Sequence, residues 1–249
     1  NYNRSNNLSI AAKKINGTVL LPGETFSYNK VVGERTIAAG YKEAGAYAGG
    51  KVIQSVGGGI CQISSTLYNT ALLANLEIVY RSNHQFETGY VAASRDATVS
   101  WPGLDFKFKN TRTYPIKIVA SAKSGVAKIS IYGIKEETEY EVVIQSKVLS
   151  YIPNTTKYIE DSSLEEGKEV VEQSGHNGCQ SEAYRILKLN GKVVSKTLLS
   201  RDTYDAMQTI IRRGTKKKVT TPTTPTTPTT PSTPTTTTPT TPTTNTTIQ

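Results

Sequence analysis

The stretch GGGICQISSTLYN, residues 57–69, places Cys61 where a glycine-rich turn meets the start of a predicted helix. Three consecutive glycines indicate backbone angles or a close approach that other residues would not tolerate. Apolar residues then recur at helical spacing, at Ile63, Leu67 and Leu72. A cysteine in the first turn of a helix lies near free N–H groups and the positive end of the helix dipole, which favour thiolate over thiol. The stretch therefore predicts a nucleophilic thiol, and a buried, inert cysteine is the alternative.

The composition favours an anionic partner, because the 249 residues carry a formal net charge of +9. Nucleic acid is not the expected partner: lysine and arginine are scattered among glutamates and cluster only at residues 212–218. Zinc-finger spacing, aromatic RNA-binding motifs and a basic zipper are all missing from the sequence. The diffuse positive charge fits an anionic wall polymer or a membrane surface better.

The chain has no apolar run of about 18 residues, so we expect no transmembrane segment in it. It begins with Asn1 and shows no signal peptide, which indicates an excised piece of a longer protein.

Two cysteines, Cys61 and Cys179, lie far apart in the sequence and are too few for a disulfide framework. We expect Cys61 to be a free thiol. Two histidines and two separated cysteines do not make a zinc site, and no acidic loop resembles a calcium site. The glycines at 57–59 lack the Lys-Ser/Thr pair that completes a phosphate loop. We therefore expect no metal and no cofactor.

Residues 1–135 are expected to form an α+β domain. A helix is predicted at 8–15, a strand at 18–21, and glycine-rich loops from there to Gly59. After the Cys61 helix, alternating and β-branched residues predict strands at 77–81, 97–101, 105–109, 116–121 and 127–132.

Residues 138–216 are expected to form an elongated, all-β second domain, because their apolar content is thin. Strands are predicted at 140–144, 155–159, 168–173, 182–189 and 193–199. The Asn190-Gly191 step predicts a hairpin between the last two. Residues 217–249 are expected to be a disordered spacer, since Thr-Thr-Pro repeats favour extended polyproline conformations and offer nothing apolar to bury.

A thiol nucleophile needs a base, and the chain offers His84 and His176. His84 follows the Cys61 helix and a predicted strand, which leaves enough chain to turn back toward the thiol. His176 lies in a Gly/Asn-rich turn of the other domain, where a solvated side chain is the simpler interpretation. We predict His84 as the general base, and a surface-loop histidine is the alternative.

An imidazole base is usually oriented by a third group. Asp96 and Asp105 are both candidates, with Asn83 and Asn110 behind them. Either aspartate could equally cap a turn or pair with an arginine, and we favour Asp96. Oxyanion donors are predicted at the backbone N–H groups of Gly59, Cys61 and Gln62.

A series of short motifs runs through the first domain: Asn3-Arg4, Asn7-Leu8, Ile15-Asn16-Gly17, Leu21-Pro22-Gly23-Glu24-Thr25-Phe26-Ser27, Val32-Gly33-Glu34-Arg35-Thr36, Gly40-Tyr41, residues 57–69, His84, Tyr90-Val91, Asp96-Ala97-Thr98-Val99 and Asp105-Phe106. In this register, from residue 3 to about residue 132, the chain resembles the VanW-like family of bacterial cell-surface proteins. The match starts inside the family's pattern, so we expect the domain to be clipped at its N-terminus.

The second domain has its own motifs: Glu160-Asp161, Leu164, Glu166-Gly167, Gly175, Gly178, Tyr184, Asn190-Gly191-Lys192, Ser195 and Gly214-Thr215-Lys216. They resemble the five-glycine surface domain that often follows VanW-like domains. That resemblance implies adhesion to polymers containing N-acetylglucosamine. Cys179 departs from the family pattern, which usually has another residue after its third glycine.

The VanW-like name comes from glycopeptide-resistance gene clusters, and some Gram-positive relatives are linked to L,D-transpeptidation. The resemblance therefore implies an enzyme that forms peptidoglycan 3-3 cross-links through a thioester on Cys61. Expected partners are peptidoglycan stem peptides and glycan, the expected location is the cell wall or the cell surface, and the expected state is a monomer. The alternatives are a non-catalytic wall-binding protein and a cysteine peptidase or amidase acting on peptidoglycan.

Overall fold

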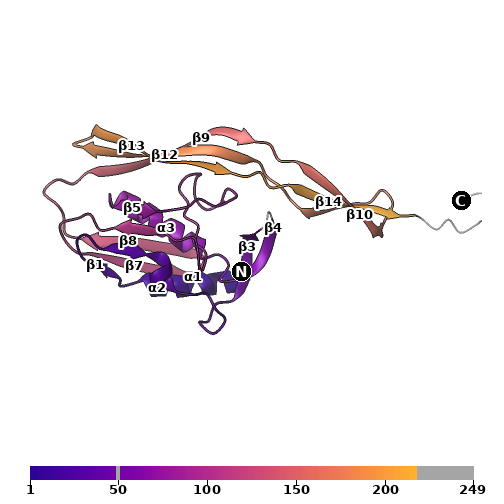
Figure 1. The fold of residues 1–249 in the computed structure, drawn as a ribbon, viewed down its shortest axis with the longest axis horizontal. Coiled ribbons are helices and arrows are strands. Elements are labelled where there is room, and N and C mark those ends of the chain that lie inside the picture. The colour runs from indigo at the N-terminus through magenta and orange to yellow at the C-terminus, as the bar shows by residue number, and fades with distance from the viewer. Residues whose placement is uncertain (49–50, 218–249) are drawn as a thin grey trace, which may run out of the picture. The chain divides into compact units, whose positions relative to one another are not determined.

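The computed structural model describes residues 1–48 and 51–217 of the chain (Figure 1). The predicted spacer at 217–249 lies outside the described residues, apart from Lys217. The described part contains an α+β first domain and an all-β second domain, as the sequence predicted.

Three helices belong to the first domain: α1 (Tyr2–Ile15), α2 (Tyr28–Val32) and α3 (Cys61–Leu73). Helix α1 is longer than the predicted 8–15, because Asn1 caps it by accepting a hydrogen bond from the N–H of Arg4. It ends where predicted, before Asn16. Helix α2 was not predicted, and the side chain of Ser27 caps it.

The strands of the first domain are β1 (Val19–Leu20), β2 (Thr25–Ser27), β3 (Glu43–Ala48), β4 (Lys51–Val56), β5 (Glu77–Tyr80), β6 (Lys107–Lys109), β7 (Ile116–Lys123) and β8 (Val126–Gly133). They form two three-stranded sheets, ordered β1-β7-β8 and β2-β6-β5, and the hairpin β3-β4. All pairs are antiparallel.

Helices α1 and α3 pack on β7 and β8 and enclose one hydrophobic core (Figure 1). The apolar face predicted for the Cys61 helix is confirmed, because Ile63, Leu67 and Leu72 are fully buried. Strand β7 packs one face on the core, because its residues alternate between buried and exposed along most of its length. Helix α3 is therefore held rigidly, and its first residue is fixed in position.

Two parts of the strand prediction are wrong. Residues 97–101 form no strand, because their backbone groups bond elsewhere: Ala97 donates to the Ser65 hydroxyl and accepts from Ser64, and Thr98 donates to Ser82. Residues 105–109 form a strand only from Lys107 onward.

The glycine-rich segment before Gly57 was predicted as loops but forms the β3-β4 hairpin. Glycine and alanine are poor strand formers, and β3 combines Gly45 with alternating alanines and contains no β-branched residue. The composition that identifies a strand was therefore weak in β3.

The second domain consists of β9 (Glu141–Ile152), β10 (Thr156–Glu165), β11 (Glu169–Gln173), β12 (Gly178–Leu189), β13 (Lys192–Tyr204) and β14 (Thr209–Lys216). They form two sheets, ordered β13-β12-β9 and β10-β14-β11, in which only the described pair β10-β14 is parallel. The Asn190-Gly191 hairpin is confirmed, with positive φ at both residues. Strand β14 was not predicted.

Candidate active site

Cys61 is the first residue of α3 and is partly buried. The N-cap, Ile60, provides no side-chain hydrogen bond, and the first turn contains no acidic residue. The thiol thus lies at an uncapped helix N-terminus, where the helix dipole favours negative charge. Its sulfur lies 3.8 Å from the Thr98 hydroxyl and 3.5 Å from the carbonyl oxygen of Val99.

The three glycines before Cys61 are required by the backbone. Gly57 and Gly59 have φ of +82° and +96°, in the left-handed region that disfavours other residues. Gly58 is required by a close approach, because a Cβ there would lie 2.2 Å from the carbonyl oxygen of Ala44. The glycines let the turn pass against the β3-β4 hairpin and deliver Cys61 to the surface of the cavity described below.

His84 and Asp96 are hydrogen-bonded to each other, with the ring Nδ1 of His84 2.5 Å from Oδ2 of Asp96. The backbone N–H of His84 donates to the same oxygen at 2.7 Å. Burial lowers the pKa of His84, but its hydrogen bonds with Asp96 and Cys61 outweigh burial and raise the pKa to about 9. At neutral pH the ring is therefore an imidazolium.

The same interaction favours the thiolate form of Cys61. Burial raises the pKa of Cys61, yet the hydrogen bond with His84 and the charge of its ring outweigh burial and lower the pKa below its ordinary value. The raised pKa of His84 and the lowered pKa of Cys61 both favour an imidazolium–thiolate pair over a neutral pair. Asp96 holds the ring at Nδ1, which leaves Nε2 as the ring nitrogen that Asp96 does not engage.

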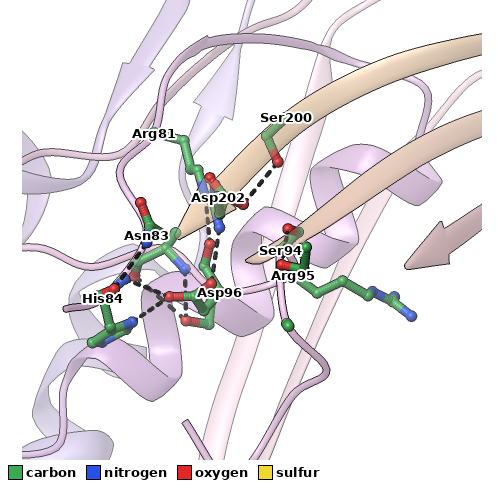
Figure 2. A network of polar contacts seen from close by, with 12 residues as sticks. Arg81, Asn83, His84, Ser94, Arg95, Asp96, Ser200 and Asp202 are labelled. Carbon is green, nitrogen blue, oxygen red and sulfur yellow. Dashed lines mark hydrogen bonds and ion pairs between the residues drawn. The ribbon is translucent and has the colours of Figure 1, made fainter. Parts of the chain in front are cut away.

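Asp96 is itself held by residues that the sequence did not single out, as Figure 2 shows for Arg81. Its Oδ1 accepts from Nη2 of Arg81 at 2.8 Å and from the Tyr204 hydroxyl at 2.5 Å. Burial raises the pKa of Asp96, but the bonds to His84, Arg81 and Tyr204 lower it below its ordinary value. Asp96 is thus a stable carboxylate despite being only 1% exposed.

The other residues considered for orienting the ring of His84 are hydrogen-bonded elsewhere. Asp105 accepts from the Ser27 hydroxyl at 2.7 Å and from the N–H of Asn29 at 2.8 Å, at the start of α2. Asn110 is fully buried and donates to two backbone carbonyls. Asn83 donates to the carbonyl oxygens of His84 and Thr203. Each of them stabilises the backbone.

His176 lies apart from this group. Its backbone pairs with Met207, its Nδ1 lies 3.0 Å from the carbonyl oxygen of Asn177, and its ring meets Phe86 edge-on at 5.8 Å. This placement agrees with its exclusion as the base.

One predicted oxyanion donor is already engaged: the N–H of Gln62 donates to the carbonyl oxygen of Gly59 at 3.0 Å. In the part of the chain that the structure describes, no backbone carbonyl accepts from the N–H groups of Gly59 and Cys61. These two donors are the ones free to bind a ligand.

Cys61 and His84 line a cavity of about 540 Å³. Two arginines, one glutamate and two aromatic residues also line it: Arg4, Arg35, Glu34, Tyr90 and Trp101. The volume lies in the range of small-molecule and cofactor sites.

Tyr90 was missed as a site residue, although it lies within one of the motifs that carry the family resemblance. Its hydroxyl lies 3.4 Å from Nε2 of His84, and burial raises its pKa. Arg81, Asp202 and Tyr204 were also missed, and two of these three come from the second domain.

Both cysteines are free thiols, which confirms the prediction for Cys61. Cys179 is fully buried and packs against Ala93 and Tyr204, between the two domains. Burial raises its pKa to about 11. Cys179, which departs from the family pattern, thus serves as a small apolar residue that packs against Tyr204.

Among the described residues, no group of histidine, cysteine and acidic side chains is placed to hold a metal ion. In the same residues no helix is both long and apolar enough to cross a membrane.

The fold and site define a cysteine-centred α+β domain joined to an all-β domain. The chain belongs to the VanW-like family: residues 3–132, more than half of its length, match the family described as "VanW like protein". Residues 143–216 match the G5 domain.

Two curated relatives match the first domain. The chain is 48% identical to "Uncharacterized protein YoaR" of Bacillus subtilis over 132 residues, which are 53% of this chain and 44% of that protein. It is 33% identical to "Vancomycin B-type resistance protein VanW" of Enterococcus faecalis over 134 residues, 51% of this chain and 49% of the relative. The chain therefore spans less than half of either relative.

Two solved structures are similar to part of the chain. They are an IgA1 protease G5 domain, at 28% identity with a TM-score of 0.22, and HP0197-G5, at 25% identity with a TM-score of 0.19. The matches cover 32% and 31% of this chain, and 98% and 100% of the respective structures.

Proposed function

We propose that this protein is a cell-wall-associated L,D-transpeptidase-like enzyme that forms peptidoglycan 3-3 cross-links through a thioester on Cys61. The observation that carries the proposal is the thiol at an uncapped helix N-terminus, which lines one cavity with His84 while Asp96 is hydrogen-bonded to that histidine. A nucleophile, its base and a group that orients the base are the parts that acyl transfer requires.

In the first half of the reaction, the Cys61 thiolate attacks the carbonyl carbon between the third and fourth residues of a donor stem peptide. The N–H groups of Cys61 and Gly59 are the free donors that can stabilise the developing oxyanion. As the C–N bond breaks, the His84 imidazolium gives its proton to the departing amine. The terminal D-residue leaves, and the acyl group remains on sulfur.

In the second half, the amine of an acceptor stem attacks the thioester carbon. His84, now neutral, takes a proton from this amine, the C–S bond breaks, and the thiolate is regenerated. Asp96 keeps the ring aligned through both halves, because Nδ1–H can donate to it whether or not Nε2 carries a proton.

The charge of the cavity supports a donor with a free carboxylate. Two guanidinium nitrogens of Arg35, Nε and Nη1, are buried without a hydrogen-bond partner among the described residues. Nη2 donates to Asn29 at 2.8 Å, and the guanidinium lies 5.7 Å from the ring of Tyr28 and 6.0 Å from that of Trp101. A donor stem that ends one residue beyond the scissile bond brings its carboxylate toward this cation.

The second domain supports a location at the cell wall. G5 domains are associated with wall glycans, and the resistance protein among the relatives is named for an antibiotic that acts on wall synthesis. Attachment to glycan raises the local concentration of stem peptides for the first domain. The positive charge of the chain favours the same anionic surroundings.

The test is to incubate the protein with purified muropeptides and analyse the products by mass spectrometry. We expect cross-linked dimers and a transient acyl adduct on the Cys61 peptide, with the buried Cys179 in the same digest as the unmodified control. Cys61→Ala should abolish both. Hydrolysed stems without dimers would instead indicate a peptidase or amidase, and no change with wild-type protein would indicate a wall-binding protein.

A further inference from the structure

Strand β13 of the second domain carries two side chains into the environment of the dyad. Asp202 accepts two hydrogen bonds from Nη1 of Arg81, at 2.6 and 2.7 Å, as Figure 2 shows. Two residues further on, Tyr204 donates its hydroxyl to Asp96. Residues at i and i+2 share one face of a strand, so β13 presents both groups to the first domain.

Arg81 lies between two carboxylates, and all three of its guanidinium nitrogens donate hydrogen bonds to Asp96 or Asp202. Its Nε donates to the backbone oxygen of Asp96 at 2.6 Å, and Nη2 donates to Oδ1 of the same residue at 2.8 Å. Nη1 is committed to Asp202. Asp202 thereby keeps one arm of the guanidinium away from Asp96, and Oδ2 of Asp96 stays available to His84.

All three charged side chains are buried: Arg81 is 6% exposed, Asp96 1% and Asp202 7%. Separating such buried ion pairs costs much free energy, because it leaves an uncompensated charge in a medium of low dielectric constant. The network is therefore a rigid support. The Ser200 hydroxyl donates to Asp202 at 2.9 Å and fixes it from its own strand.

The contact around Tyr204 is equally well determined. Its hydroxyl also accepts from the N–H of Ser94 at 2.7 Å, and Ser94 and Ser181 are hydrogen-bonded at 2.7 Å. Cys179 packs beneath the ring. Tyr204 is fully buried, so its hydroxyl cannot turn to water instead.

We propose that the second domain completes the candidate active site, with Asp202 and Tyr204 as positioning residues that hold Asp96 in the orientation from which it aligns His84. The inference rests on the proposed function for its catalytic meaning. It extends the second domain's role from wall attachment to maintenance of the nucleophile. The first domain alone would leave Nη1 of Arg81 without Asp202 and Oδ1 of Asp96 without the Tyr204 hydroxyl.

The charged and titratable groups that face Asp96 are His84 and Arg81 from the first domain and Tyr204 from the second. Two more tyrosines act on it at longer range, Tyr68 and Tyr90. Replacing Asp202 by asparagine removes a negative charge and frees Arg81 to bond both oxygens of Asp96. Both effects weaken the hold of Asp96 on the His84 proton.

The chain contains only two histidines, so an NMR pH titration of histidine resonances resolves each one in the full-length protein. We expect His84 to titrate near 9 in the wild type and at a lower pH in Asp202→Asn, because Asp96 then shares its oxygens with the freed Arg81. His176 is the internal control. Asp202→Glu, which restores the charge, should return His84 toward the wild-type midpoint.

Arg201→Gln is the matched control, because Arg201 lies on the same strand, is 71% exposed and pairs with Glu182. It should leave the His84 midpoint unchanged. Tyr204→Phe should accelerate solvent exchange of the His84 Nδ1 proton, because Asp96 can then rotate. Both test substitutions preserve side-chain size. An unchanged midpoint in Asp202→Asn, together with unchanged exchange in Tyr204→Phe, would overturn the inference.

The titration needs no substrate, so it separates the two proposals. Cross-linking by the wild type, with an unmoved His84 midpoint in Asp202→Asn and unchanged exchange in Tyr204→Phe, would leave the proposed function standing and remove the role of the second domain. A shifted His84 midpoint without cross-linking would keep Asp202 and Tyr204 as positioning residues for Asp96 and His84, and it would reject the transpeptidase activity.

Discussion

His84→Gln tests whether the imidazole is what ionises Cys61. Glutamine keeps a polar side chain of similar size but cannot become a cation. Without the imidazolium, burial remains as the principal influence on the thiol, and burial raises its pKa. We therefore expect the pKa of Cys61 to rise from below its ordinary value to ~8.5 or above.

The size of the effect follows from the thiolate fraction at pH 7. A thiol with the ordinary pKa of ~8.5 is ~3% ionised there, so full ionisation would raise the thiolate concentration by at most ~30-fold. A more basic thiolate is also a better nucleophile, and this cancels roughly half of that gain on a logarithmic scale. The expected loss of alkylation rate in His84→Gln is therefore a few-fold.

The assay is iodoacetamide alkylation between pH 5 and 10, with the modified peptides quantified by mass spectrometry. The wild-type rate should rise through a midpoint below ~8.5 and then level off, because the thiolate is already formed. Cys179, whose pKa is raised to about 11 in a buried position, provides the slow reference in the same sample. His176→Gln is the matched histidine control and should behave as wild type.

The sign of the pH dependence differs for turnover. Cross-linking requires the thiolate and the imidazolium together, so it should fall when Cys61 is protonated at low pH. It should fall again as pH rises through about 9, where His84 loses its proton. If His84→Gln alkylates with the wild-type rate and midpoint, the thiol owes its state to the helix N-terminus, and the proposed base is refuted.

Two further substitutions test the framework of the site. Gly58→Ala places a methyl group 2.2 Å from a β3 carbonyl oxygen and should lower the unfolding free energy by ~1–3 kcal/mol. The control is Gly17→Ala, which has open space around it and should lose only the ~1–2 kcal/mol of a left-handed backbone, because its φ is +84°. Equal stability of Gly58→Ala and wild type in urea titrations would disprove the close approach. Arg81→Met strands the buried Asp96 and Asp202 and should cost ~3–5 kcal/mol, so an unchanged melting temperature would show that the two carboxylates are not held by this cation.

The sequence could predict the local part of the site. The glycine run and the apolar spacing that follows it indicated both the turn and the helix, and the structure places Cys61 at that junction. His84 and Asp96 could be proposed because they lie close to Cys61 in the sequence and in the same domain. The structure brings these three side chains together, while their catalytic roles stay predictions.

The other parts of the site depend on contacts between residues far apart in the sequence, which local sequence patterns cannot predict. Arg81 and Asp202 lie on different domains, and strand β13 was predicted only to residue 199, before either Asp202 or Tyr204. Residues 97–101 looked like a strand because their apolar spacing resembles one, yet side chains of α3 supply their hydrogen bonds. In both cases tertiary contacts decide the structure.

The charges of the site alternate along one chain of contacts: the Cys61 thiolate, the His84 imidazolium, the Asp96 carboxylate, the Arg81 guanidinium and the Asp202 carboxylate. Alternation lets an anionic sulfur share a buried site with two carboxylates, because each anion faces a cation and none faces another anion. Asp96 without Arg81 would favour its own protonation on burial and would then hold His84 less strongly. Since the last charge of the series belongs to β13, the inferred role of the second domain predicts that loosening its contact with Arg81 shifts the Cys61 equilibrium toward the neutral thiol.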